Sequence, residues 1–213
     1  ETIGIGCIGL GVRGGVLIWD IVGNEKIAPI HGTRVVAVCD VYEPYLERGA
    51  RRGKNPDVKK YRDYRELLAD PAVDAVVIAT PDHWHAKMLI DAANAGKDVY
   101  CEKGWSRTLE EAKAMHAAVK ENKIVMQLGH QGRARPSAIQ AAEAVRQSAF
   151  GPISLVQLYS YKNRAPGKEF FRWYTWYDYN RPDPQQVSAS LKSVNMLGSA
   201  PKRPFEMERF WHW

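Results

Sequence analysis

The sequence predicts an α/β fold in which a doubly wound parallel sheet is followed by the start of an α+β domain. Apolar, β-branched runs at residues 3–8, 33–39 and 73–79 are typical of parallel strands that are buried on both faces. Segments with helical periodicity separate such runs over roughly the first 150 residues, and this alternation predicts a parallel sheet. A glycine-rich turn directly after the first run indicates the edge of the sheet where a ligand binds.

The remaining elements follow the same alternation. Short apolar runs predict strands at 58–61, 98–101 and 124–128, and the periodicity predicts helices at 44–52, 64–69, 84–95 and 137–147. Thr108 and Glu111 form a capping-box pattern, which predicts that another helix begins there. Ligands of such sheets bind beyond the carboxyl ends of the strands, so the residues that follow each strand are the candidate site residues.

The sequence GLGVRG at residues 9–14 has the GxGxxG spacing. Its glycines allow a tight turn, a close approach of the backbone to a pyrophosphate and close packing of helix on strand, and the phosphate lies at the helix N-terminus. Glycines at positions 4, 6 and 9 fit the same spacing, but only the later frame has a strand before it. We therefore expect a dinucleotide to contact Gly9, Gly11, Val12, Arg13 and Gly14.

Asp40 ends the second predicted strand. A carboxylate in this place accepts hydrogen bonds from both ribose hydroxyls of NAD and repels the 2′-phosphate of NADP, so NAD is the favoured cofactor and NADP the less favoured one. The alternative is an acidic residue that only caps the next helix.

The composition is that of an ordinary globular protein, with 213 residues, 45% hydrophobic and 25% charged. The formal net charge of +6 suits either a nucleic-acid surface or an anionic cofactor. Basic residues are spread along the chain, and the densest cluster, at 48–54 with Lys59, Lys60 and Arg62, is expected on the solvated surface. We therefore expect no nucleic-acid partner.

No apolar run in the sequence is long enough to cross a bilayer, so no membrane contact is expected. The sequence opens on Glu1 without a signal-peptide pattern, which favours a cytoplasmic location, or a periplasmic one if an export signal was removed upstream. Cys7, Cys39 and Cys101 each lie in a strand-like run and are expected to be buried and unpaired.

Residues 80–85, TPDHWH, follow the strand predicted at 73–79. Asp82, His83 and His85 are metal-ligating types, but adjacent histidines in a tight loop rarely converge on one ion, so no metal is expected. We expect Thr80, Pro81, His83 and His85 to line the cofactor. His85 fits a buried structural role as well as this one.

Glu102 and Lys103 end the strand predicted at 98–101, at the same edge of the sheet. A lysine partly buried beside a nicotinamide can accept a hydroxyl proton as hydride leaves, which makes Lys103 the candidate catalytic residue. Glu102 would orient Lys103 or hold the cofactor. The alternative is an exposed pair in which Glu102 and Lys103 form a salt bridge.

Together, these motifs resemble the Gfo/Idh/MocA oxidoreductases, named for glucose-fructose oxidoreductase and inositol dehydrogenase. The run GKDVYCEK at 96–103 is the most specific piece, and the resemblance covers nearly the whole of a cofactor domain at 1–150. It implies an NAD(P)-binding Rossmann domain there and a partial substrate domain at 151–213. It also implies hydride transfer to or from a hydroxyl of a sugar, cyclitol or related compound.

By this resemblance, Lys103 matches the lysine of a Glu-Lys-Pro motif that assists proton transfer and contacts the cofactor, with Gly104 in place of the proline. His130, Gln131 and Arg133 match the stretch that faces nicotinamide and substrate. We expect Gln131 to contact the cofactor, and Lys103, His130 and Arg133 to contact the substrate.

The family's later Asp and His motif, whose histidine acts in acid-base catalysis, has no match here, which implies a truncated substrate domain. His212 lies in an aromatic run of the kind that precedes that motif. Alternating residues at 153–161 predict an antiparallel strand, and the aromatic segment at 159–179 favours an oligomer contact or a substrate wall, hence a homo-oligomer. Two other functions stay open: an NAD-dependent glycosidase that works by transient oxidation, and a non-catalytic NAD-binding module.

Overall fold

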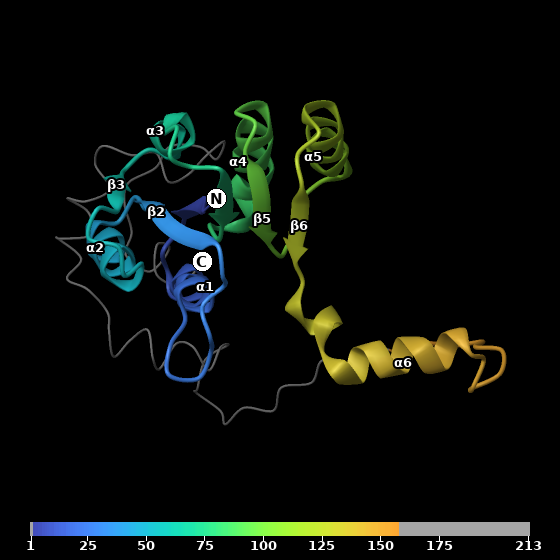
Figure 1. Ribbon diagram of the computed structural model, residues 1–213. Coiled ribbons are helices and arrows are strands. Elements are labelled where there is room, and N and C mark those ends of the chain that lie inside the picture. The colour runs from blue at the N-terminus through green and yellow to red at the C-terminus, as the bar shows by residue number, and fades with distance from the viewer. Residues whose placement is uncertain (1, 158–213) are drawn as a thin grey trace, which may run out of the picture. The chain divides into compact units, whose positions relative to one another are not determined.

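In the computed structural model, which describes residues 2–157, six parallel strands form one sheet (Figure 1). The strands are β1 (Ile3–Ile8), β2 (Thr33–Cys39), β3 (Lys59–Tyr61), β4 (Ala75–Ile78), β5 (Asp98–Glu102) and β6 (Met126–Gly129). Their order is β3-β2-β1-β4-β5-β6, and every neighbouring pair is parallel. This is the Rossmann order, whose switch point lies between β1 and β4. The predicted doubly wound sheet is confirmed.

Five helices cover the two faces of this sheet (Figure 1). They are α1 (Val12–Val22), α2 (Glu43–Arg52), α3 (Tyr64–Ala69), α4 (Asp82–Asn94) and α5 (Leu109–Asn122). On one face, Ile18 of α1 and Leu46 of α2 belong to an apolar cluster with β1 and β2. On the other face, Leu67, Leu89 and Met115 anchor α3, α4 and α5 on the sheet. Both faces of the sheet are therefore buried, as the apolar strands predict.

The structure confirms the main hydrogen bond of the capping box at the start of α5, between Thr108 and Glu111. The Glu111 amide donates to the Thr108 hydroxyl oxygen at 3.1 Å, which satisfies one of the first-turn amides of the helix. The Glu111 carboxylate accepts from the Arg107 amide at 2.8 Å. The two residues thus fix where the chain turns into α5 after the loop that follows β5.

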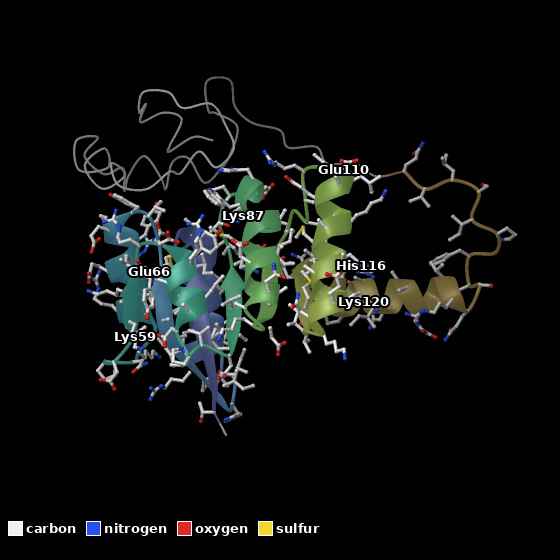
Figure 2. The ribbon with its side chains drawn as sticks, turned by 90° about the horizontal axis from the view of Figure 1, so that it is seen from above. Lys59, Glu66, Lys87, Glu110, His116 and Lys120 are labelled. Carbon is white, nitrogen blue, oxygen red and sulfur yellow. The ribbon has the colours of Figure 1, made fainter. Side chains whose placement is uncertain are left out.

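The outer surfaces of the helices carry charges of both signs. Figure 2 shows Glu66 on α3, Lys87 on α4, and Glu110, His116 and Lys120 on α5, all of them exposed. Inside, Cys7, Cys39 and Cys101 are buried and unpaired, as predicted. Burial raises the pKa of Cys101 to about 12, so this thiol stays protonated and unreactive at neutral pH.

Among the described residues, those up to Gly129 belong to one compact unit and those from His130 to residue 157 belong to a second. The described part of this unit contains η1 (Gln131–Ala134) and α6 (Pro136–Arg146), so the helix predicted at 137–147 is confirmed. The domain boundary near residue 150 stays a prediction. Within the described range, no helix is both long and apolar enough to span a bilayer.

The strand predicted at 153–161 is wrong in its described part. Residues 153–157 form no strand, and Ile153, Leu155 and Val156 are exposed. A strand needs a neighbour to pair its backbone N–H and C=O groups, and residues 2–157 supply none beside this segment. Residues 158–161 and the aromatic segment at 159–179 lie outside the described residues.

Candidate functional site

The glycine loop joins β1 to α1 in the frame that the sequence favours, because β1 ends at Ile8 and Gly9 follows it. Gly9 has a φ of +83°, a conformation that glycine adopts without penalty. A Cβ on Gly14 would lie 1.8 Å from the Gly9 carbonyl oxygen, so only glycine lets α1 approach the loop this closely. Gly4 and Gly6 of the rejected frame lie inside β1.

The N-terminus of α1 has its amides available to a ligand. Gly11 is the N-cap residue and supplies no side-chain hydrogen bond, and the first turn of the helix contains no acidic residue. The amides of such a turn, together with the helix dipole, bind anions. This arrangement fits the diphosphate of a dinucleotide, as expected for Val12 and Arg13.

Asp40 follows β2 and holds the glycine loop. Its Oδ2 accepts from the Leu10 amide at 2.6 Å, and its Oδ1 accepts from the Tyr42 amide at 2.8 Å. Burial raises the pKa of Asp40 to about 6, although the two backbone hydrogen bonds and the nearby Arg48 oppose this rise. A carboxylate oxygen has two acceptor sites, so each oxygen can still accept a ribose hydroxyl.

We expect NAD affinity to fall in acid because of Asp40. The carboxylate is ionised above its pKa of about 6 and becomes protonated as the pH falls through that value. Protonation removes acceptor capacity toward the ribose hydroxyls, so the affinity is complete well above pH 6 and declines as the pH falls through that value. Fluorescence titration of NADH across this pH range measures the decline, which Asp40→Asn should abolish. A wild-type affinity that is flat across the range contradicts the expectation.

Arg48 is a site residue that the sequence reading missed. It belongs to the cluster expected on the solvated surface, yet its Nη2 donates to the Leu10 carbonyl at 2.9 Å and its guanidinium lies 4.3 Å from the Tyr45 ring centroid. The structure corrects that expectation, because α2 packs beside the loop and brings Arg48 onto it. The cationic side chain thereby lies beside Asp40, where it favours the ionised carboxylate.

Glu102 at the end of β5 pairs with Arg13, which lies in the glycine motif. Arg13 Nε donates to Glu102 Oε1 at 2.6 Å, with side chains that are 34% and 5% exposed respectively. The Tyr100 hydroxyl donates to the same oxygen at 3.4 Å, and the Lys103 amide donates to Oε2 at 3.2 Å. The alternative salt bridge between Glu102 and Lys103 is therefore wrong.

We expect Arg13→Met to lower the free energy of unfolding by about 2–3 kcal/mol, since it leaves the Glu102 carboxylate buried without its cation. The partial exposure of Arg13 keeps this below the cost for a fully buried pair. Adding Glu102→Gln should restore more than half of the loss, because a neutral amide needs no cation. Urea denaturation of both single variants and the double variant measures the coupling. If the losses in free energy of unfolding of the two single variants simply add in the double variant, the two side chains are not coupled and the expectation is wrong.

Lys103 lies directly after β5, and its side chain is exposed rather than partly buried as expected. Among residues 2–157 it forms no ion pair, so its side chain is not committed to a carboxylate of that part of the chain. The Lys103–Gly104 peptide bond is cis. The Gly104 carbonyl contacts His85, as described next.

The TPDHWH segment turns from β4 into α4, with Pro81 as the N-cap of the helix. The Thr80 hydroxyl contacts Met88 Sδ at 3.6 Å, and His83 is half-buried. His85 is fully buried, and both of its ring nitrogens lie within hydrogen-bond distance of backbone carbonyl oxygens, so neither nitrogen is available to a further ligand. These contacts favour the structural role of His85 over a contact with the cofactor.

Within the described residues, no group of three or more His, Cys, Asp and Glu side chains is placed to hold a metal ion.

His130, Gln131 and Arg133 follow β6 at the start of the second unit. All three are exposed, and the Arg133 amide donates to the His130 carbonyl at 3.0 Å as η1 forms. Their roles toward cofactor and substrate stay predictions.

A model of the oxidoreductase family with the NAD-binding Rossmann fold matches residues 3–130. The chain belongs to this Gfo/Idh/MocA family. The confirmed fold and the glycine loop fit the NAD-binding domain of the family, since the cradle formed by Gly9 and Gly14 has no room for side chains.

Two curated relatives and one solved structure illustrate what this family member is similar to. A scyllo-inositol 2-dehydrogenase (NAD(+)) of Bacillus subtilis is 31% identical over 150 residues, which cover 70% of this chain and 43% of the relative. An alpha-N-acetylgalactosaminidase of Shewanella oneidensis is 29% identical over 161 residues, 72% of this chain and 34% of the relative. The crystal structure of scyllo-inositol dehydrogenase from Lactobacillus casei, with bound NAD(H) and scyllo-inositol, matches with a TM-score of 0.63 at 26% identity.

That match covers 71% of this chain and 43% of the Lactobacillus casei chain. The chain therefore spans less than half the length of each of these three proteins. NAD binding, the function of the family's Rossmann domain, can therefore be assigned to residues 3–130. The activity of a whole family member is proposed below.

Proposed function

We propose that the full-length protein transfers hydride between NAD and a hydroxyl-bearing carbon of a cyclitol or sugar. One observation carries the proposal: the glycine loop, Asp40 and the Glu102–Lys103 pair all follow parallel strands of one sheet and therefore lie at the same edge. The family and the names of its inositol dehydrogenases support the substrate class.

The candidate site residues divide into proposed cofactor contacts and proposed substrate contacts. Bound NAD would supply the acceptor for hydride. The amides of Gly11, Val12 and Arg13 would hold its diphosphate, and Asp40 would accept the ribose hydroxyls. The further cofactor contacts that we propose are Thr80, Pro81, His83 and Gln131.

Lys103, in its neutral amine form, would take the proton of the substrate hydroxyl as the C–H hydride leaves, which yields a carbonyl product, reduced cofactor and a protonated lysine. Its exposed amine, free of ion pairs in residues 2–157, is open to this role. His130 and Arg133 would hydrogen-bond the remaining hydroxyls of the substrate. A homo-oligomer, expected from the sequence, belongs to the same proposal.

The test combines cofactor titration with a substrate panel. NADH and NADPH are titrated into the full-length protein, and scyllo-inositol, myo-inositol and a series of sugars are then offered with NAD. We expect saturable binding with a preference for NADH, and formation of NADH with at least one polyol. Preference for NADPH, or no turnover of any polyol, contradicts the proposal.

A second candidate is a glycosidase that uses NAD for transient oxidation, since one relative carries the name alpha-N-acetylgalactosaminidase. Release of the sugar from a chromogenic N-acetylgalactosaminide without net formation of NADH would favour it. A third candidate is a non-catalytic NAD-binding module, since the family match at residues 3–130 is a match to the NAD-binding Rossmann fold. Binding of NADH by the full-length protein without either reaction would support this third function.

A further inference from the structure

His85 links the loops that follow two neighbouring strands. It lies in the first turn of α4 and is fully buried. Its Nε2 is 2.9 Å from the Thr80 carbonyl oxygen, after β4, and its Nδ1 is 2.7 Å from the Gly104 carbonyl oxygen, after β5. Because β4 and β5 pair side by side, one ring spans the gap between their loops.

Both partners of this ring are hydrogen-bond acceptors. A carbonyl oxygen only accepts, so each contact draws on a ring N–H, of which the imidazole has one when neutral and two when protonated. Three charged residues lie near Gly104: Glu102 and Lys103 precede it in the chain, and Asp82 is close to it in space. Asp82 Oδ2 lies 3.6 Å from the position of a Cβ on Gly104, and Glu102 is already paired with Arg13.

The segment held by His85 contains Lys103. On its N-terminal side, Glu102 is fixed by Arg13 and accepts the Lys103 amide. On its C-terminal side, Gly104 is fixed by His85. The backbone of Lys103 is thus held from both sides while its side chain stays exposed and without an ion pair among the described residues.

We propose that His85 is a positioning residue for Lys103: its imidazole holds the Gly104 carbonyl against the Thr80 loop and so directs the lysine side chain toward the substrate hydroxyl. This inference rests on the proposed role of Lys103 in proton transfer. Reactions depend steeply on such placement, since an error of about 1 Å can cost ~100-fold in rate. In this role His85 acts through the backbone of Gly104 and not through a contact of its own with substrate or cofactor.

The activity test uses His85→Gln and His85→Phe in the full-length protein, with Tyr64→Phe as the matched control. Tyr64 donates to Asp91 at 2.5 Å in the later part of α4, and the phenylalanine ring keeps the edge-on contact with Trp84. We expect both His85 variants to lower kcat by ~10- to 100-fold with a change in KM for NAD of less than ~3-fold. His85→Gln, which keeps an N–H donor, should retain more activity than His85→Phe. An equal loss of kcat in Tyr64→Phe, or unchanged kcat in both His85 variants, overturns the proposal.

Two measurements decide the positioning role without turnover. In protein labelled with ¹⁵N-histidine, at least one ring N–H of His85 should exchange slowly with solvent, and its signal should vanish in His85→Gln. Backbone amides of residues 102–105 should exchange faster in His85→Gln than in wild type or in Tyr64→Phe. Rapid exchange of the His85 ring proton, or unaltered exchange at 102–105, would refute the positioning role even if no polyol is ever turned over. Slow exchange of the His85 ring proton in a protein that oxidises no polyol would support the contacts of His85 with Thr80 and Gly104. It would contradict the proposed function.

Discussion

Lys103→Met is expected to lower kcat of the full-length protein by ~10²- to 10⁴-fold, the range for loss of a general acid-base group. The exposed side chain and the absence of an ion pair within residues 2–157 predict that the folded state tolerates the change, so the free energy of unfolding should stay within ~0.5 kcal/mol of wild type. Steady-state kinetics with a saturating polyol and NAD measure the loss.

Two further variants separate proton transfer from charge. Lys103→Arg keeps a positive charge, but the guanidinium stays protonated and cannot accept the proton of the substrate hydroxyl, so this variant should be nearly as inactive as Lys103→Met. Lys87→Met removes a lysine of α4 that pairs with Asp91 on the surface, and it should retain wild-type kinetics. Full activity in Lys103→Arg would show that the lysine serves only as a positive charge.

Gly14→Ala is expected to destabilise the folded state by roughly 2–4 kcal/mol and to weaken NADH binding ~100-fold or more. The added Cβ would lie 1.8 Å from the Gly9 carbonyl oxygen and 2.9 Å from its carbon, and both are backbone atoms that can yield only if α1 moves off the loop. Movement of α1 withdraws the amides that hold the diphosphate. Denaturant unfolding and fluorescence titration measure the two effects.

Gly11→Ala is the matched control for stability. A Cβ there would meet only the edge of the Tyr45 ring, at an ordinary 3.7 Å, and the φ of −61° suits alanine. Its free energy of unfolding should therefore change by less than ~1 kcal/mol. If Gly14→Ala unfolds and binds NADH as the wild type does, the close packing of α1 on the loop is not what forms the cofactor site.

The order of elements was predictable because it depends on local pattern. Buried parallel strands are apolar throughout, and the glycine loop and Asp40 occupy fixed places in a Rossmann unit. Strand ends were less predictable: the run at 73–79 yields β4 only at Ala75–Ile78, because pairing with β1 and β5 decides where the strand ends.

The connections within the site were not predictable from local pattern. Arg13 and Glu102 are 89 residues apart, and no spacing in the sequence indicates that they meet. Arg48 is one of several neighbouring basic residues, and only the packing of α2 beside Leu10 distinguishes it from solvated surface. His85 fitted two roles until the fold placed carbonyls at both ends of its ring.

The Leu10 peptide shows what the glycine loop contributes before any ligand arrives. Its amide is held by Asp40, its carbonyl by Arg48, and its side chain is fully buried against Gly49 of α2. The turn is thus preorganised, and NAD does not have to immobilise a mobile segment when it binds. NAD binding should therefore carry little entropic penalty from ordering the backbone of the loop. Little of the free energy gained from the diphosphate contacts is then lost to that ordering.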